Sequence, residues 1–275
     1  MGLRYNSMLD DLLIGGIAGA VSRTVTAPLE LYKIQRQNQY IKGASVKNVL
    51  KKEGIRYLWK GNLTNCLRVF PQIGTNFAAF EKSKKYIFNE IEDEPLKNFY
   101  SGGIAGVFSM TTVYPLETIR TRLSLQMNKS HYSSPFQAAK QIKLNEMYKG
   151  LGISILGFGP FSALNFMFYY QYKDFFESRD FSQTSTKLLS GGFAGMSALT
   201  FTYPTDMLRK HFQMAGFSQD VPKYDGIIDG FRCVIKKDGF FGLYRGLLAS
   251  YVRLFPCLAV QFWCLEKGKK ILGKN

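Results

Sequence analysis

The sequence predicts an all-α membrane protein with six transmembrane helices, arranged as three tandem two-helix repeats with pseudo-threefold symmetry around a central cavity. Three observations lead to this prediction: a repeated segment, glycine pairs at the spacing of packed membrane helices, and an uneven distribution of charge among the loops. The 275-residue chain is 46% hydrophobic and 15% aromatic, which excludes a disordered basic tail. Its net charge of +16 requires an anionic partner, which could be nucleic acid, a membrane surface or a small substrate.

The first half of the repeat occurs three times without a gap. The aligned segments are GGIAGAVSRTVTAPLE at 15–30, GGIAGVFSMTTVYPLE at 102–117 and GGFAGMSALTFTYPTD at 191–206. Their prolines are separated by 87 and 89 residues. Self-similarity at a nearly fixed period indicates a repeat architecture.

A second matched half follows within each repeat. It begins with an aromatic residue, a base and a glycine, and a proline comes ten residues after that glycine. The glycine and proline pairs are Gly61 with Pro71, Gly150 with Pro160, and Gly246 with Pro256. We therefore expect a second helix in every unit, and we divide the chain into three repeats at 1–97, 98–187 and 188–275.

The composition of the first halves favours helices in a membrane. Each carries a G-x-x-x-G pair, such as Gly15 and Gly19, which lets helix backbones approach closely in lipid but would mostly destabilise a soluble helix. No apolar run reaches 18 residues and the mean hydropathy is −0.10. Both values are expected if every helix turns a polar stripe, such as Ser22 and Thr26, toward a watery cavity.

The loops within the repeats are basic and the connectors between them are acidic. Loops 38–60, 126–149 and 213–245 hold six, four and five basic residues against one, one and four acidic ones. Connectors 85–97 and 174–187 hold two basic residues each, against four and three acidic ones. The positive-inside rule then puts the three loops on the negative side of the membrane and both termini on the other side.

Each first half ends in the motif Pro-x-acid-x-x-base. A proline kinks a membrane helix, and the i, i+3 spacing keeps the acid and the base on one face. Charges inside a membrane need partners, so three such pairs can close a ring around the threefold axis. The motif residues are Pro28, Glu30 and Lys33; Pro115, Glu117 and Arg120; and Pro204, Asp206 and Arg209.

From about Leu12 to Lys270 these motifs resemble the mitochondrial carrier family. The resemblance implies a matrix-side gate in which three ion pairs link neighbouring repeats, with a glutamine bracing some of them. Gln37 and Gln213 match the brace position, and Ser124 replaces it in the second repeat. The implied pairs are Glu30 with Arg120, Glu117 with Arg209, and Asp206 with Lys33.

The resemblance also implies a second gate on the cytoplasmic side, built from an aromatic-acid-x-x-base motif in each second helix. The third member replaces the aromatic residue by leucine, and the second has a tyrosine in place of the acid. Three bases therefore face two acids, and we expect weaker closure on this side. The six residues of this gate are Glu81, Lys84, Tyr170, Lys173, Glu266 and Lys269.

The candidate substrate residues lie between the two gates, where alternating access requires a binding site. Three arginines can bind phosphates, Gly157 and Phe158 can form an apolar platform for a base, and an amide adds a hydrogen-bonding group. These residues are Arg23, Arg68, Asn76, Gly157, Phe158 and Arg253. The arrangement resembles the nucleotide-transporting branch of the family, which implies transport, by exchange, of ATP, ADP, deoxynucleotides or related phosphorylated nucleotides.

Several alternatives stay open on the same fold. SRTVTAPLE resembles the ATP-Mg/phosphate and coenzyme A carriers and GNLTNCLRVFP the ADP/ATP carriers, while the ADP/ATP hallmark of three arginines before three methionines is absent. A proton-leak carrier is also compatible, and a soluble helical repeat protein that binds nucleic acid fits less well. No phosphate loop or catalytic set supports an enzyme, and the four cysteines and two histidines are too scattered for a metal site.

The resemblance implies a location as well. We expect a multi-pass monomer in the mitochondrial inner membrane, with both termini on the intermembrane-space side. Membrane lipid, with cardiolipin as the candidate, and a phosphorylated substrate are the expected partners, and no nucleic acid or cofactor is expected.

Overall fold

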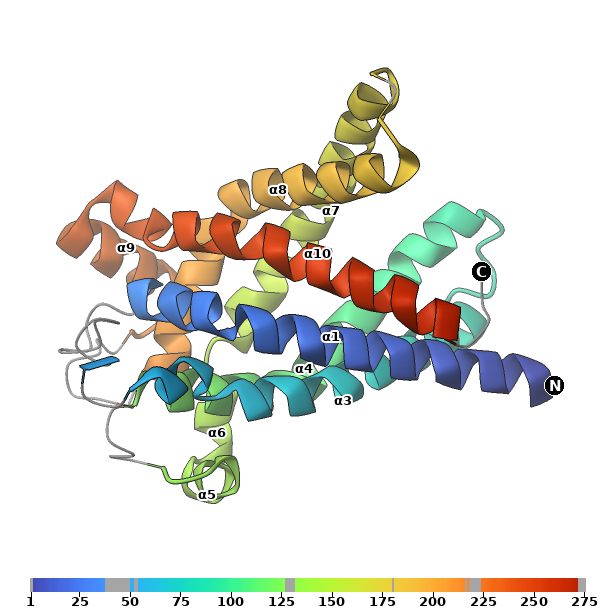
Figure 1. Cartoon of the computed structure of the whole chain (residues 1–275). Coiled ribbons are helices and arrows are strands. Elements are labelled where there is room, and N and C mark those ends of the chain that lie inside the picture. The colour runs from blue at the N-terminus through green and yellow to red at the C-terminus, as the bar shows by residue number, and fades with distance from the viewer. Residues whose placement is uncertain are drawn as a thin grey trace.

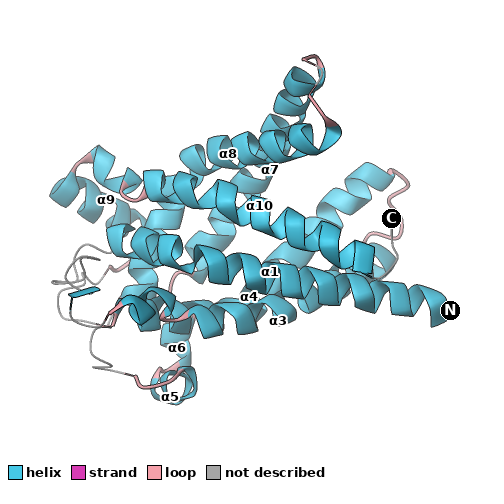
Figure 2. Cartoon of the chain, in the orientation of Figure 1, coloured by secondary structure: helices cyan, strands magenta, loops and turns pink. Residues whose placement is uncertain are grey.

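The computed structural model describes residues 2–37, 50–51, 54–126, 132–179, 181–215, 217 and 224–271. Within these ranges the chain is helical and contains no strand (Figure 2). The helices are α1 (Gly2–Gln37), η1 (Ile55–Trp59), α3 (Asn62–Lys82), η2 (Ser83–Ile87), α4 (Glu94–Leu125), α5 (Pro135–Gln141), α6 (Leu144–Met147), α7 (Leu151–Glu177), α8 (Gln183–Met214), α9 (Ile227–Asp238), η3 (Phe240–Tyr244) and α10 (Leu247–Ile271).

The repeat prolines lie inside the long helices α1, α4 and α8, as the sequence predicts. Pro28, Pro115 and Pro204 are all helical residues, and each is followed within one or two turns by its charged motif. The repeat boundaries expected at 97/98 and 187/188 fall in the first turns of α4 and α8, because these helices begin at Glu94 and Gln183. The sequence motifs start only later in each helix.

A glycine in the left-handed backbone conformation precedes the second helix of each repeat. Gly61, Gly150 and Gly246 have φ values of 81°, 90° and 90°, a region that other residues rarely adopt. A Cβ atom on these glycines would lie 3.2, 3.1 and 3.4 Å from the backbone oxygens of Arg120, Arg209 and Lys33, respectively. The glycines therefore fix two things at once: the turn into the second helix, and close packing against a helix that carries a ring base.

In the described part of the chain, six long helices, α1, α3, α4, α7, α8 and α10, follow one another in a closed series of contacts. The most extensive contacts pair α1 with α10, α3 with α4, and α7 with α8, so the first and last helices also meet. Smaller contacts join α1 to α3, α4 to α7, and α8 to α10 within the repeats. Figure 1 shows α1 and α10 side by side, with the N-terminal end of α1 near the C-terminal end of α10.

The outward faces of the helices are apolar. Among the described residues, Leu144–Glu177 and Phe240–Gly268 are long and apolar enough to cross a membrane, yet only 17% and 11% of their most apolar windows are buried in the protein. Large side chains on other helices, such as Ile17, Leu63 and Phe108, are 55–60% exposed. A soluble protein would bury such helices against a core, so this surface suits a lipid environment.

Packing within the second repeat is looser than in the other two. In the first and third repeats a phenylalanine ring lies against a glycine of the preceding long helix: Phe70 on Gly16, and Phe255 on Gly192. The second repeat has Gly159 at the phenylalanine position, and nothing lies within 4 Å of where a Cβ of Gly103 would be. The contact between α4 and α7 therefore lacks the phenylalanine side chain that fills the corresponding contact in the other two repeats.

Candidate functional site

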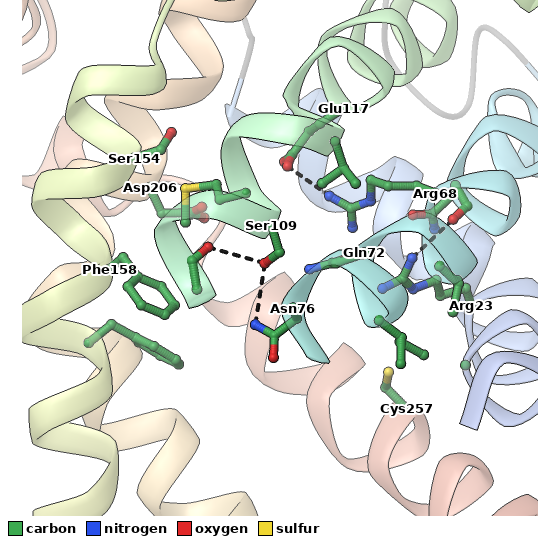
Figure 3. Close-up of a pocket in the computed structure, with 18 of the residues that line it drawn as sticks. Arg23, Arg68, Gln72, Asn76, Ser109, Glu117, Ser154, Phe158, Asp206 and Cys257 are labelled. Carbon is green, nitrogen blue, oxygen red and sulfur yellow. Dashed lines mark hydrogen bonds and ion pairs between the residues drawn. The ribbon is translucent and has the colours of Figure 1, made fainter. Parts of the chain in front are cut away.

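A cavity of about 1040 Å³ lies between the six long helices. Its lining includes at least one residue from each of them: Gly15 of α1, Asn76 of α3, Ser109 of α4, Phe158 of α7, Asp206 of α8 and Arg253 of α10. Figure 3 shows Asn76, Ser109 and Phe158 around the same open space. All the residues that the sequence assigned to substrate binding line this cavity.

Three ion pairs between repeats close one end of the cavity. Arg120 Nη2 lies 3.0 Å from Glu30 Oε1, Arg209 Nη2 lies 3.2 Å from Glu117 Oε1, and Lys33 Nζ lies 2.9 Å from Asp206 Oδ2. These are the three pairs that the family resemblance implies. The six side chains are between 8% and 21% exposed, so water screens them little.

The two expected glutamine braces act in different ways. Gln37 donates directly to Asp206 Oδ2 at 3.2 Å and to the hydroxyl of Tyr203 at 3.1 Å. Gln213 instead accepts through Oε1 from Lys210 and from Thr121, each at 3.0 Å, and is linked to the Glu117 carboxylate through Lys210.

The brace position in the second repeat makes no contact with the ring carboxylates. Ser124 donates to the backbone oxygens of Arg120 and Lys60. The ring therefore has one direct brace and one indirect brace.

Two of the three candidate substrate arginines are bound to ring glutamates. Arg68 Nη1 lies 2.7 Å from Glu117 Oε2, and Arg253 Nε lies 2.9 Å from Glu30 Oε2. Arg23 donates from Nη1 to the backbone oxygen of Asn65 at 3.0 Å (Figure 3). The sequence places these arginines in the cavity but gives no sign of the two ion pairs, because they join residues that belong to separate motifs.

Positive charge exceeds negative charge on the described cavity wall. Seven cationic side chains and four carboxylates line it, an excess of three positive charges. The cations are Arg23, Lys33, Arg68, Arg120, Arg209, Lys210 and Arg253, and the carboxylates are Glu30, Glu81, Glu117 and Asp206. Low-dielectric walls concentrate such a field, so the cavity attracts polyanions. No group of three His, Cys, Asp or Glu side chains in the described part of the chain could hold a metal.

The expected apolar platform is only partly open to the cavity. A Cβ on Gly157 would lie 2.7 Å from Thr205 Oγ1, so the space beside this glycine is already occupied by α8. Phe158 lines the cavity with its ring packed against Gly106 of α4. A flat base can therefore stack on Phe158, whereas Gly157 serves the contact between α7 and α8. Asn76 lies across the cavity and donates to Ser109 Oγ at 3.3 Å.

The opposite end of the cavity is not closed by its predicted gate. Lys84 pairs with Glu94 and Lys173 with Glu177, at 2.7 and 3.6 Å. Tyr170 is 60% exposed, and Glu81 and Glu266 are exposed too. The side chain of Lys269 lies outside the described residues. Among the side chains that are described, no ion pair joins two members of this gate, so the structure is closed at the ring alone.

Sequence reasoning missed two buried cations near the ring. Lys210 contacts Glu117 at 2.8 Å, and the signal for it was a second base directly after Arg209. Arg122 is 2% exposed, pairs with Glu146 at 3.0 Å, and donates to the backbone oxygens of Gln213 and Ala215. Arg122 therefore ties the end of α4 to α6 and to the end of α8.

Comparisons of the chain with a family model and with individual proteins agree on one family. A family model described as mitochondrial carrier protein matches residues 5–90, 92–180 and 181–275. The mitochondrial adenine nucleotide transporter ADNT1 of Arabidopsis thaliana is 31% identical over 98% of this chain and 88% of its own length. The mitochondrial adenyl nucleotide antiporter SLC25A24 of Homo sapiens is 32% identical over 95% of this chain, which spans 58% of that protein. The mitochondrial substrate carrier family protein C of Dictyostelium discoideum is 34% identical, with coverage of 96% and 58%.

Proposed function

The chain belongs to the mitochondrial carrier family, and from that premise we propose that it exchanges nucleotides across the mitochondrial inner membrane by alternating access. The observation that carries the proposal is the placement of Arg23, Arg68 and Arg253 in a cavity that is closed at one end. Relatives that cover nearly all of this chain are named for adenine or adenyl nucleotide transport. The protein is a carrier rather than an enzyme.

The arginines bind the phosphates and Phe158 receives the base. A guanidinium presents several N–H donors in a plane that matches phosphate oxygens, and it stays charged. Asn76 and Ser109 line the same cavity as Phe158, and their polar groups can contact the base or the sugar (Figure 3). The phosphates are thus recognised by charge and the base by stacking.

The two ring glutamates couple substrate binding to gate opening. Glu30 binds Arg120 through Oε1 and Arg253 through Oε2, while Glu117 binds Arg209 through Oε1 and Arg68 through Oε2. A phosphate that attracts Arg253 or Arg68 removes one of the partners that hold these carboxylates in place. A binding event in the cavity thereby weakens the closed ring.

The membrane arrangement follows from the same proposal. The six long helices cross the membrane with pseudo-threefold symmetry, and the units 1–97, 98–187 and 188–275 each supply two of them. The ring forms the matrix gate, the second charged layer forms the cytoplasmic gate, and both termini face the intermembrane space. The protein works as a monomer because three units already close the series of helix contacts. Its exposed apolar surface binds lipid, with cardiolipin as the candidate.

Reconstitution tests this function directly. The purified chain is inserted into liposomes loaded with ATP, and efflux is measured against external ribonucleotides, deoxynucleotides, phosphate and coenzyme A. We expect exchange of nucleotides that is faster than exchange of phosphate or coenzyme A. ATP efflux that is driven by external phosphate or coenzyme A but by no nucleotide, or a fatty-acid-dependent proton conductance without nucleotide movement, would contradict the proposal. A carrier that is monodisperse without detergent would contradict the membrane arrangement.

A further inference from the structure

We propose that Lys210 is a positioning residue, which holds Glu117 in the closed ring and sets how readily Arg68 is released to the substrate. Lys210 lines the cavity, yet its side chain is only 3% exposed. The position directly after the ring base holds Ile34 in the first repeat and Thr121 in the second. The third repeat thus adds a cation that has no counterpart in the other two.

All the described contacts of the Lys210 ammonium are with acceptors near Glu117. Its Nζ atom lies 2.8 Å from Glu117 Oε1, 3.0 Å from Gln213 Oε1 and 3.4 Å from Thr121 Oγ1. An ammonium has three donors, so these three partners satisfy it. Since Glu117 and Thr121 belong to α4, the lysine also joins α8 to α4 across the boundary between two repeats.

Glu117 needs this second cation because its other ring partner is shared. Arg209 Nη2 lies 3.2 Å from Glu117 Oε1 and 3.0 Å from Asp206 Oδ1, so one nitrogen serves two carboxylates. A buried carboxylate with too few partners is strongly destabilised. Without Lys210, the Glu117 carboxylate would have two described cationic partners left: Arg209, which it shares with Asp206, and Arg68.

The consequence for transport rests on the proposed function. A nucleotide phosphate competes with Glu117 for Arg68, whose Nη1 atom lies 2.7 Å from Glu117 Oε2. Lys210 neutralises part of the Glu117 charge and so weakens the hold of Glu117 on Arg68. Loss of Lys210 makes that hold stronger, and the nucleotide then binds less well.

The test compares Lys210→Met and Lys210→Arg in the full chain, reconstituted in liposomes, with radiolabelled ATP as the probe. We expect Lys210→Met to raise the KM for ATP about tenfold, a typical loss for a coupled charge. Lys210→Arg should restore most of the affinity because it keeps the charge. Lys187→Met is the matched control: Lys187 is an exposed lysine of α8, roughly 34 Å along the helix axis from Lys210, and its KM should stay at the wild-type value.

A second background shows whether Lys210 acts through Glu117. In Glu117→Gln, adding Lys210→Met should leave the KM where Glu117→Gln alone puts it. An unchanged KM in Lys210→Met, or an equal rise in the Glu117→Gln background, would overturn the proposal. If the wild-type protein transports no nucleotide, the proposed function fails, and Lys210 is then judged by unfolding temperatures in detergent. Non-additive losses of the two substitutions support the proposal, and additive losses overturn it.

Discussion

Arg253 and Glu30 connect the substrate cavity to its closed end, with Arg253 Nε 2.9 Å from Glu30 Oε2. The same carboxylate closes the ring through Oε1, which lies 3.0 Å from Arg120 Nη2. Glu30 is therefore shared between a cation that can bind substrate and a cation that belongs to the gate. Any change at Glu30 therefore acts on both layers together.

Charge reversal tests the pairing of Glu30 with Arg120. Glu30→Arg should reduce nucleotide exchange severely, because three cations would then face one another without a carboxylate. Adding Arg120→Glu should restore part of the exchange, since the ion pair re-forms with opposite polarity. Recovery stays partial because the new arginine at position 30 repels Arg253. Initial exchange rates are measured in liposomes at equal amounts of inserted protein, and a double variant no better than Glu30→Arg would argue against the pairing.

Neutralising any one of the cavity arginines should weaken nucleotide binding. An unpaired phosphate charge in a confined site costs about 2–5 kcal/mol, which is roughly 30- to several-thousand-fold in affinity. Arg23→Gln should show this effect most simply, since the described contact of Arg23 is with a backbone oxygen and no ring glutamate loses a partner. The KM for ATP gives the measurement, and Arg232→Gln on the exposed face of α9 provides the control. Equal KM values in the two variants would remove Arg23 from the site.

The charge of the cavity predicts a preference for nucleotides without magnesium. The wall carries an excess of three positive charges. Free nucleoside di- and triphosphates carry about three and four negative charges, whereas bound Mg²⁺ removes about two of them. Exchange of ATP should therefore be faster in EDTA than in excess Mg²⁺. Exchange that requires Mg²⁺ would show that the metal complex is the transported form, as in an ATP-Mg/phosphate carrier.

Two glycine substitutions should change stability in opposite directions. At Gly159 no atom lies within 4 Å of a new Cβ, so Gly159→Ala should stabilise α7 by about 0.5–1 kcal/mol through helix propensity. At Gly106 a methyl group would overlap the ring of Phe158, so Gly106→Ala should destabilise the protein. Thermal unfolding of the purified carrier in detergent compares the two variants with wild type. Destabilisation by both would mean that α4 and α7 lie closer together than the structure shows.

The local pattern of the sequence was enough to predict the helices, and together with the family resemblance it predicted the ring pairs. Each depends on spacing along one helix or on a motif that occurs three times: Glu30, Glu117 and Asp206 all stand two residues after a proline, with their base three residues further on. Because the motif is repeated, it also indicates which residues of different units can meet. If three equivalent helices surround one axis, an acid of one unit can meet the base of a neighbouring unit.

The tertiary structure alone decided which contacts the residues that differ between the units make. Arg68 and Arg253 bind ring glutamates, Lys210 joins α8 to α4, and Thr205 fills the space beside Gly157. These contacts join residues from different motifs, and they depend on how far each helix is rotated and how deeply it packs. The sequence also does not show which of the two gates is closed. Both charged layers are present in it, but only the folded arrangement shows the ring paired and the opposite layer apart, because a gate is defined by distances between helices.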